Sequence, residues 1–322
     1  MKKVPLWRPR ASLKTIHARA LIYTRLRAFF FERDVLEVET PVLSRAATVD
    51  SNIDSFATRD GRWLQTSPEF PMKRLLAAGS GAIWQIARVF RVDEAGHFHN
   101  PEFSLLEWYR PGFDHLRLMD EVETLIRHLG VAAASPFERL SYRDAFHRHA
   151  SLDPHCASLA QLHDACARLP GGVPTLTNDD EAARRDFYLD LLLSRLVGPT
   201  LGSEQPLFLF DFPASQAALA RVRDGNPPVA ERFELFWRGI ELANGFHELS
   251  NATEQRRRFE KDRARRTAQG REAPPFDHYL IDALASGLPD CAGVALGLDR
   301  LLMLLLDLDG VADTLTFDDG RA

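Results

Sequence analysis

Two arginines have the residue type and the surroundings of anion-binding groups. Arg91 lies in the run FRVDE at 90–94, and Arg300 lies in the run GVALGLDRL at 293–301. A guanidinium group is always charged, and its planar fork matches the oxygens of a carboxylate or a phosphate. The glycine-rich run ahead of Arg300 predicts a strand that leads into a helix, with Arg300 on its first turn. We therefore expect both arginines to bind phosphate or carboxylate groups.

Two glutamates lie in the segment ERFELFWRGIELANGFHEL at 231–249, which has the pattern of a β-hairpin turning at Arg238-Gly239. A two-residue turn would set Glu234 opposite Ala243. Because side chains alternate along a strand, Glu234 and Glu241 would then share one face as diagonal neighbours, roughly 7–8 Å apart at the backbone. Mg²⁺ prefers one or two carboxylates together with phosphate oxygens. The pair therefore predicts a magnesium site, with two plain surface charges as the weaker alternative.

The elements that position these residues predict an α+β fold with an antiparallel β-sheet flanked by helices. Helical spacing covers 17–32, 71–76, 115–129 and 253–268, strand patterns cover 35–40, 62–66, 83–91 and 102–110, and 291–306 runs from a strand into a helix. Most strands are joined by hairpins and loops, which favours antiparallel pairing. Between about 130 and 225, helical stretches alternate with proline and glycine turns. We interpret this region as a mainly helical elaboration of a single domain covering 1–322.

Composition narrows the class of protein. The chain has 322 residues, of which 45% are hydrophobic and 26% charged, and these are ordinary globular values. Its 40 basic and 45 acidic residues give a formal charge of −5, whereas nucleic-acid-binding proteins are usually basic. Three cysteines are too few for a disulfide framework. No apolar run approaches the about 20 residues of a membrane span, so we expect a cytoplasmic protein.

Three segments resemble, in this order, motifs 1, 2 and 3 of the class II aminoacyl-tRNA synthetases. They are VLEVETP at 35–41, FRVDE with HNPEF at 90–103, and GVALGLDRL at 293–301. NGFHEL at 244–249 is similar to the lysine-binding segment of the lysyl enzymes. This resemblance, which covers residues 19–305, implies the class II catalytic fold, the substrates ATP and a lysine-like amino acid, and Mg²⁺. It also implies a homodimer formed through the motif-1 helix and strand.

The resemblance implies a role for each matched residue. Arg91 and Arg300 would be the catalytic residues, and Glu234 with Glu241 would hold the metal. ATP would be bound by Arg91, Val92, Asp93, His99, Asn100, Phe103, Glu241, Leu242, Gly297 and Arg300. The amino acid would be bound by Ser67, Pro68, Glu69, Tyr109, Asn244, Glu248 and Ala295. Glu69 would hold the α-amine and Glu248 the side-chain amine, and two such carboxylates select a diamine, because an apolar amino acid would leave one charge buried and unpaired.

Several features depart from the lysyl enzymes. Motif 1 begins within the first forty residues, so we expect no N-terminal anticodon-binding domain. Ala295 replaces a usual glycine and Ser67 a small apolar residue, which indicates a diamine other than α-lysine. The runs TSPEFPMKRLL, FPASQAALA and GIELANGFHEL, at 66–76, 212–220 and 239–249, resemble instead the elongation factor P–(R)-β-lysine ligases.

That resemblance implies an ATP-dependent, AMP-forming amino acid–protein ligase. Such an enzyme would activate (R)-β-lysine, or lysine, as an aminoacyl-adenylate and transfer it to the ε-amine of a lysine of elongation factor P, with no tRNA and no membrane as partner. Two alternatives stay open. One is a truncated lysyl-tRNA synthetase-like enzyme that charges tRNA with lysine, and the other is a non-catalytic synthetase-like regulator.

Two further patterns have a structural and a functional interpretation. A group of histidines and cysteines lacks paired metal-ligand spacing, so we expect ordinary helical packing; its members are His147, His149, His155, Cys156, His163 and Cys166. The stretch 254–271 holds eight basic and three acidic residues. We expect a solvated helix with pairs such as Glu254–Arg258 and Asp262–Arg266, and a docking face for an acidic partner is the alternative.

Overall fold

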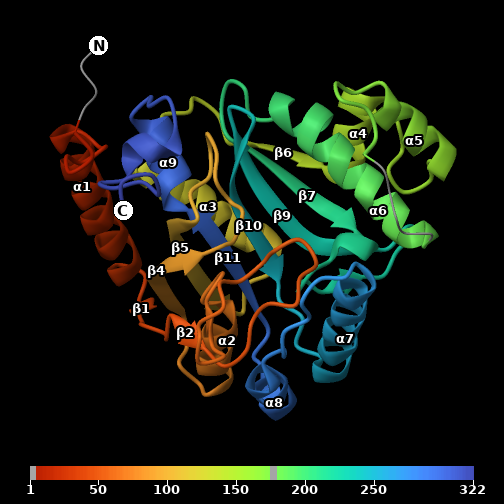
Figure 1. The fold of residues 1–322 in the computed structure, drawn as a ribbon, viewed down its shortest axis with the longest axis horizontal. Helices are drawn as coiled ribbons and strands as arrows, with labels where there is room; N and C mark the ends of the chain where they lie inside the picture. The colour runs from red at the N-terminus through yellow and green to blue at the C-terminus, as the bar shows by residue number, and fades with distance from the viewer. Residues whose placement is uncertain (1–4, 175–179) are drawn as a thin grey trace. The chain divides into compact units, whose positions relative to one another are not determined.

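The computed structural model describes residues 5–174 and 180–322, and the chain forms two compact units (Figure 1). Unit 1 comprises Met1–Phe113, Thr124–Val131 and Leu249–Ala322, and unit 2 comprises Asp114–Glu123 and Ala132–Glu248. Helix α3 (His115–His128) starts in unit 2 and ends in unit 1. Among the described residues, no helix is both long enough and apolar enough to cross a bilayer.

Unit 1 contains a mostly antiparallel set of strands. β4 (Ile83–Phe90), β5 (Glu102–Pro111) and β11 (Cys291–Gly297) pair antiparallel, and β1 (Leu36–Glu37) joins β4 in parallel. β2 (Leu43–Ser44) and β3 (Trp63–Leu64) form a separate ladder. The helices of this unit are α1 (Leu13–Phe31), α2 (Glu69–Ala77), α7 (Ala252–Ala268), α8 (His278–Gly287), α9 (Leu298–Leu305) and the 3₁₀ turn Val311–Thr314.

Register places a buried carboxylate on one face of β5. Directly opposite residues of an antiparallel ladder share a face, and Glu107 lies opposite Gln85 on β4 and opposite Ala295 on β11. Leu105 and Tyr109, each two residues away, lie on the same face. We call this face of β4, β5 and β11 the Glu107 face.

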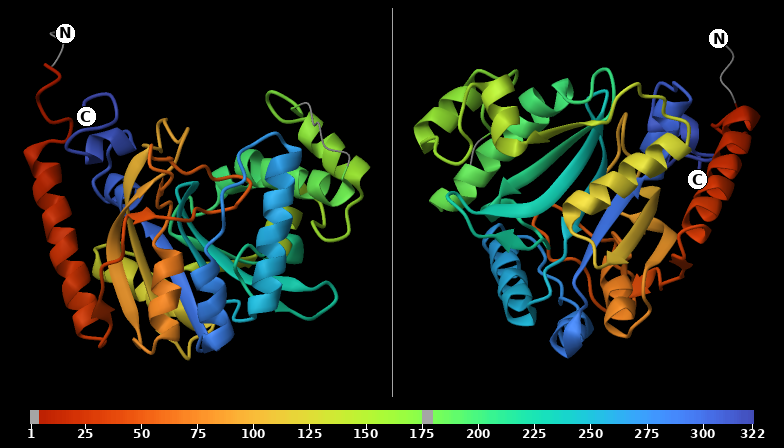
Figure 2. Two further views of the ribbon diagram at one scale, coloured as in Figure 1. Left: turned by 60° about the horizontal axis from the view of Figure 1, so that its bottom comes forward. Right: turned by 180° about the vertical axis from the view of Figure 1, so that it is seen from behind.

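The reverse face of the same strands packs on α1. Trp84 and Trp108 are cross-strand neighbours, and the ring of Phe30 stacks on Trp84 at a centroid distance of 4.6 Å and meets the edge of Trp108 at 5.5 Å. Figure 2 shows α1 running along β4 and β5. Ser12 caps this helix, since its hydroxyl oxygen accepts a hydrogen bond from the amide of Thr15. Burial of these aromatic rings fixes the sheet on its helix.

Unit 2 is built around β9 (Val229–Trp237). β10 (Ile240–His247), β7 (Leu207–Pro213) and β8 (Val222–Arg223) pair with it antiparallel, and β6 (Glu138–Ser141) runs parallel to β7. The helices α4 (Tyr142–Ala150), α5 (Leu159–Ala167) and α6 (Glu181–Leu192) lie together beside these strands (Figure 1). Short turns of helix cover Leu193–Val197, Gly198–Thr200 and Ala214–Gln216. Tyr142 stacks on Phe146 and packs on Phe212, which joins α4 to β7 in one core.

The expected α+β class, helices and hairpin are confirmed, with three differences in detail. The motif-1 strand shrinks to the two residues of β1, after which one more backbone bond, from the amide of Val38 to the carbonyl of Trp84, follows the ladder. The region 130–225 contains β6 and β7 besides its helices, and β7 is an aromatic run buried on both sides. The hairpin turns at Arg238-Gly239 as expected, but its register shifts by one residue between Glu241 and Ala243. The single-domain interpretation stays a prediction.

Candidate active site

Arg91 follows directly on β4, and its amide donates to the carbonyl of Pro101 at 2.9 Å. Its guanidinium group lies 5.1 Å from the ring centroid of Phe103, donates to the carbonyl of Thr66 at 3.3 Å and pairs with Glu94 at 3.4 Å. These contacts position the guanidinium group, and because both partners of the Glu94 pair are partly exposed, that pair offsets its charge only weakly. The structure thus brings together two residues that the sequence assigned to nucleotide binding.

Arg300 lies on the first turn of α9, as expected. Its Nη2 atom lies 2.7 Å from Nε2 of His99, and its Nε donates to the carbonyl of Phe98 at 3.2 Å. Gly297 is the N-cap of this helix and lies opposite Leu105 on the Glu107 face, where it leaves out a side chain. Arg300 and His99 are therefore in contact next to Gly297, the last residue of β11, which has no side chain.

The predicted ATP-binding residues in the loop after Arg91 either make contacts with backbone groups or are exposed. The amide of Val92 donates to the carbonyl of Asp54, and Asp93 is exposed with a left-handed φ of 61°. Asn100 donates to the carbonyl of Glu102 at 2.7 Å and accepts from the amide of Asp319 at 3.1 Å. These two bonds join the Asn100 amide to backbone groups rather than to other predicted site residues.

A buried polar cluster occupies the Glu107 face. Glu107 is only 2% exposed, and both of its carboxylate oxygens accept hydrogen bonds at 2.7 Å, one from the hydroxyl of Ser67 and one from that of Tyr109. Burial, followed by the nearby charge of Glu69, raises the pKa of Glu107 to about 7. Ala295 lies directly opposite it in the ladder. Three predicted substrate-binding residues, Ser67, Tyr109 and Ala295, thus surround a carboxyl group.

Glu69 begins α2 directly after Pro68, and its amide donates to the hydroxyl oxygen of Ser67 at 3.0 Å. One of its carboxylate oxygens lies 2.6 Å from the ammonium group of Lys73, a side chain that is 2% exposed. The Ser67 hydroxyl thus donates to the carboxylate of Glu107 and accepts from the backbone amide of Glu69. The result is an anionic pocket wall that contains one internal cation.

Sequence analysis missed Glu107 and Lys73. The sequence did contain a signal for Glu107, which is a glutamate inside the apolar strand run SLLEWY, two residues before Tyr109. Burying a carboxylate there is costly unless it has hydrogen-bond or charged partners, so its presence indicates such partners. Lys73 was harder to recognise, because a lysine four residues after a glutamate on a helix is typical of an exposed surface ion pair. Its burial depends on the packing of α2, which sequence spacing does not contain.

In unit 2 the two predicted metal ligands influence each other. Glu234 is 5% exposed, and burial, followed by the charge of Glu241, raises its pKa to about 8. Arg232 offsets part of this charge through an ion pair with Glu234 at 2.5 Å. A buried carboxylate whose charged form is destabilised by a neighbouring carboxylate fits a divalent cation, because the cation would relieve the repulsion.

Asn244 reaches the same cluster because of the hairpin bulge. The expected pairing of Glu234 with Ala243 is wrong: the strand has an extra residue at Leu242, and Asn244 lies opposite Glu234. The amide oxygen of Asn244 accepts from Nε of Arg232 at 3.1 Å. The bulge therefore places the side-chain amide of Asn244 next to the residues around Glu234.

Arg232 is a third residue that sequence analysis missed. It donates to the carbonyl of Gln216 at 3.0 Å and lies 4.3 Å from the ring centroid of Phe212, both in the run FPASQA. Glu248 is 1% exposed, and its backbone bridges to that of Ala220, at the end of the same run. The run thus supports the residues around Glu234 and Glu248.

The members of the histidine and cysteine group at 147–166 differ in burial: Cys166 is fully buried, whereas His147, Cys156 and His163 are exposed. Within residues 5–174 and 180–322, no grouping of three ligating side chains includes any of its members. Burial raises the pKa of the Cys166 thiol to about 11, and the thiol contacts the carbonyl of Tyr188. This agrees with the expected helical packing.

Comparison with known proteins accounts for the whole chain. The family model described as tRNA synthetases class II (D, K and N) matches residues 3–320. A Salmonella paratyphi A protein named elongation factor P–(R)-β-lysine ligase is 48% identical over 331 aligned residues, which cover 100% of both chains. Proteins of the same name from Salmonella arizonae and Salmonella dublin are 47% identical, again over 100% of both chains. These matches confirm both resemblances seen in the sequence, and the chain belongs to the family of class II tRNA synthetases of the D, K and N group.

Proposed function

We propose that this chain is an ATP-dependent ligase that activates (R)-β-lysine and transfers it to a lysine ε-amine of elongation factor P. The observation that carries the proposal is the buried carboxylate Glu107, held by Ser67 and Tyr109 beside Glu69. A wall of carboxylates with hydroxyl partners suits an amine-bearing substrate, because an apolar amino acid would leave the negative charge unpaired. The full-length similarity to proteins that bear this name supports the same activity.

In this proposal Arg91 and Arg300 bind the phosphate groups of ATP. A carboxylate oxygen of the amino acid attacks the α-phosphorus of ATP, a P–O bond to the β-phosphate breaks, and pyrophosphate leaves with the electron pair. Because two anions must meet, catalysis is mainly positioning and charge neutralisation. Arg91 binds the α-phosphate and the attacking carboxylate, while Phe103, 5.1 Å away, stacks on adenine. Arg300, oriented by His99, binds the far phosphates.

Glu234 and Glu241 are the residues that would hold Mg²⁺. When bound, the ion supplies charge neutralisation at the phosphate oxygens. Arg232 keeps the carboxylate of Glu234 oriented by an ion pair, and the amide oxygen of Asn244 in turn accepts a hydrogen bond from Arg232. Leu242, which is the extra residue of the bulge, contributes its backbone next to Glu241.

Transfer then forms an amide. The ε-amine of the acceptor lysine attacks the carbonyl carbon of the adenylate, AMP leaves, and the amine loses a proton. Ala295 shapes the choice of amino acid, because its methyl group lies opposite Glu107 and narrows the pocket where lysyl enzymes usually have glycine. Glu69 holds the amine nearer the carboxyl group, and Glu248 holds the distal amine.

The assembly is proposed to be a homodimer, with the reaction in the cytoplasm, where its translation-factor substrate is found. Apolar side chains on α1 and β1 support the dimer, since Leu21, Phe31 and Leu36 are all more than half exposed. Such side chains gathered on one helix and one strand are typical of a protein–protein contact.

The direct test combines enzyme, ATP, (R)-β-lysine and unmodified elongation factor P, followed by mass measurement of the factor. We expect a gain of one lysyl mass on one lysine. No gain, together with efficient charging of tRNA by labelled lysine, would favour the truncated synthetase instead.

Pyrophosphate exchange tests the site separately, across lysine isomers. We expect exchange with (R)-β-lysine to exceed exchange with α-lysine, and Glu241→Gln or Arg300→Ala to abolish it. The matched control is Glu260→Gln, an exposed glutamate on α7, which should exchange like the parent. Exchange that persists in both site variants would refute these residue roles, and absence of exchange in the parent would favour a non-catalytic regulator.

A further inference from the structure

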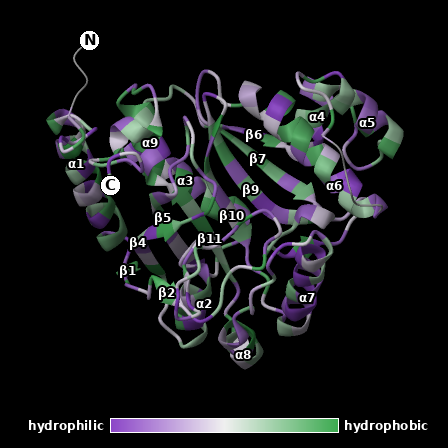
Figure 3. Cartoon of the chain, viewed as in Figure 1, coloured by the Kyte–Doolittle hydropathy of each residue, from purple (hydrophilic) through white to green (hydrophobic). Residues whose placement is uncertain are grey.

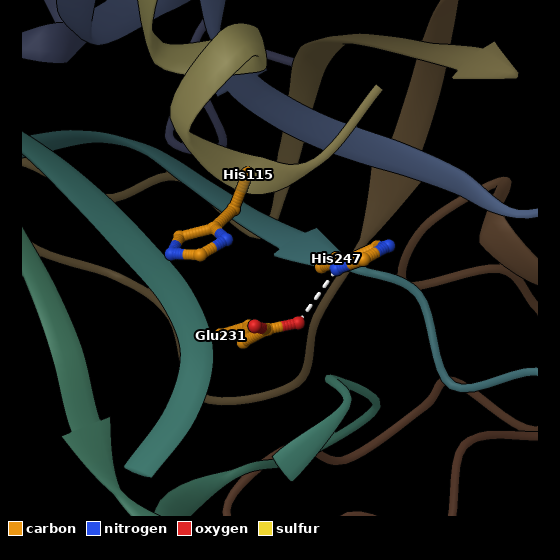
Figure 4. Close-up of side chains that lie close together, drawn as sticks. All are labelled: His115, Glu231 and His247. Atoms are coloured by element: carbon orange, nitrogen blue, oxygen red, sulfur yellow. Dashed lines mark hydrogen bonds and ion pairs between the residues drawn. The ribbon is translucent and has the colours of Figure 1, made fainter. Parts of the chain in front are cut away.

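A second set of metal-ligating side chains lies in unit 2. His115 begins α3, Glu231 lies near the start of β9, and His247 ends β10. One ligand atom from each of the three lies within 4.8 Å of the other two. Figure 4 shows the three side chains converging, with the imidazole of His247 bonded to the carboxylate of Glu231 at 2.6 Å. We call these residues the His-Glu-His cluster.

The cluster lies on the face of β9 opposite to that of Glu234. Successive side chains of a strand point to opposite faces, so residues three apart, such as Glu231 and Glu234, point apart. The ladder ends with the pair Arg232 and Phe246, and the next residues on the two strands, Glu231 and His247, join through their side chains on one face. Arg221 fixes both, because its amide donates to the carbonyl of His247 and its carbonyl accepts from the amide of Glu231. The backbone positions of the two candidate metal ligands, Glu231 and His247, are therefore fixed relative to each other.

His115 is the unusual member. It is 2% exposed, and within the described part of the chain neither of its ring nitrogens has a hydrogen-bond partner. Leaving a buried polar atom unpaired costs about 1–3 kcal/mol, so two unpaired nitrogens on one ring require an explanation. The ring is nearly parallel to that of His247, with centroids 6.5 Å apart.

A carboxylate flanks the cluster. Oδ1 of Asp211 lies 3.7 Å from Nε2 of His115, which is ion-pair distance if the imidazole is protonated but too long for a good hydrogen bond, and among the described residues this buried oxygen has no hydrogen-bond partner. Asp211 lies at an irregularity of β7 with a left-handed φ of 58°, a strained conformation for this residue type. Arg223 bonds to Asp211 at 2.7 Å and reaches Glu231 at 3.5 Å. Two carboxylates against one guanidinium leave a net negative charge beside two imidazoles.

We propose that the His-Glu-His cluster binds a divalent transition-metal ion, with Zn²⁺ as the best match. Two imidazoles and a carboxylate are a donor set that zinc favours, and a fourth position remains for water or Asp211. Binding replaces the proton shared by His247 and Glu231, and it satisfies a ring nitrogen of His115. Zinc–nitrogen bonds of about 2.0–2.1 Å are shorter than the present spacing allows, so small side-chain rotations close the site. The ion would tie the start of α3 to the hairpin that carries Glu234 and Glu241.

The experiment uses the full-length protein, stripped with a chelator and then titrated with Zn²⁺ and, separately, Co²⁺. We expect one tightly bound equivalent by elemental analysis, visible d–d absorption bands with Co²⁺, and a higher melting temperature with metal. His115→Ala and His247→Ala should each weaken binding by at least about tenfold, because even outer-shell changes at metal sites cost 10–100-fold. His147→Ala removes an exposed histidine of the same unit and should bind like the parent.

Two further measurements keep the outcome decisive. Glu241→Gln should retain the zinc, which separates this site from the proposed magnesium site; loss of zinc in that variant would overturn the assignment. Circular dichroism in chelator establishes that His115→Ala is folded, and His115→Gln replaces it otherwise. Substoichiometric zinc, absence of cobalt bands in the parent, or equal binding by parent and His115 variants would each overturn the proposal.

Discussion

Glu107 illustrates how one side chain joins stability to chemistry. Its side chain is almost fully buried, yet hydroxyls of Ser67 and Tyr109 both donate to its carboxyl group and so favour the ionised form. Burial and the charge of Glu69 act in the opposite sense and prevail, which raises its pKa to about 7. The folded protein therefore holds a proton at this site over a pH range in which the unfolded chain has lost it. An incoming ammonium group would shift this balance towards the carboxylate.

This balance predicts a pH-dependent stability that Glu107→Gln removes. Because the pKa rises from 4.5 in the unfolded chain to about 7, the contribution of Glu107 to the free energy of unfolding falls as the pH rises between these values, by roughly 1–3 kcal/mol. Denaturant unfolding of parent and variant across that range, without substrate, measures the difference. Glu260→Gln, an exposed glutamate, is the control and should follow the parent. A parent-minus-variant difference that stays constant with pH would contradict the raised pKa.

At the scale of elements, α7 combines a solvated face with one buried arginine. Most of the helix is hydrophilic in Figure 3, and Glu254 pairs with Arg257 and Arg258, the second of these pairs as expected from the sequence. The expected Asp262–Arg266 pair is wrong. Arg266 is 4% exposed and pairs instead with Asp54, which packing brings near from a distant part of the chain.

We predict that Arg266→Ala destabilises the protein by about 2–4 kcal/mol. Besides the ion pair, its guanidinium donates to the carbonyls of Asp50, Ile53 and Glu272, and these lose their partner in the variant. Arg257→Ala, which breaks an exposed pair on the same helix, should change stability by no more than about 0.5 kcal/mol. Thermal and denaturant unfolding of both variants measures the contrast. Equal effects would mean that the enclosed network contributes no more than a surface pair.

The β9–β10 hairpin shows which structural features the sequence pattern predicts and which it does not. Alternation and the Arg238-Gly239 turn predicted both strands, the turn and the shared environment of Glu234 and Glu241, because these depend on local periodicity. The extra residue at Leu242 was not predictable, since a bulge changes no residue type in the pattern. It decides that Asn244, rather than Ala243, faces Glu234.

For the molecule as a whole, sequence motifs predicted the fold class and singled out Arg91, Arg300, Glu234 and Glu241 as site candidates, because these residue types are restricted by chemistry. They did not predict Lys73, Arg232 or the His-Glu-His cluster. Each of these depends on contacts between elements far apart in the chain, such as Arg232 with Gln216 or His115 with Asp211. Long-range packing, rather than local spacing, decides which ordinary residues become buried and functional.

The proposed homodimer yields a prediction at this scale. Phe31 at the end of α1 and Leu36 on the edge strand β1 are 83% and 56% exposed, and together with Val35, Trp84 and the paired Arg27 and Glu37 they line one hollow. An apolar patch beside an unpaired strand edge is a surface that a second copy would cover. We expect the parent to be a dimer by light scattering coupled to size-exclusion chromatography, and Phe31→Asp to be a monomer, because the dimer would bury its charge. Tyr279→Asp, a change at an exposed aromatic residue on α8 that does not line this hollow, should remain dimeric. A monomeric parent, or a dimer that persists in Phe31→Asp, would place the interface elsewhere or remove it.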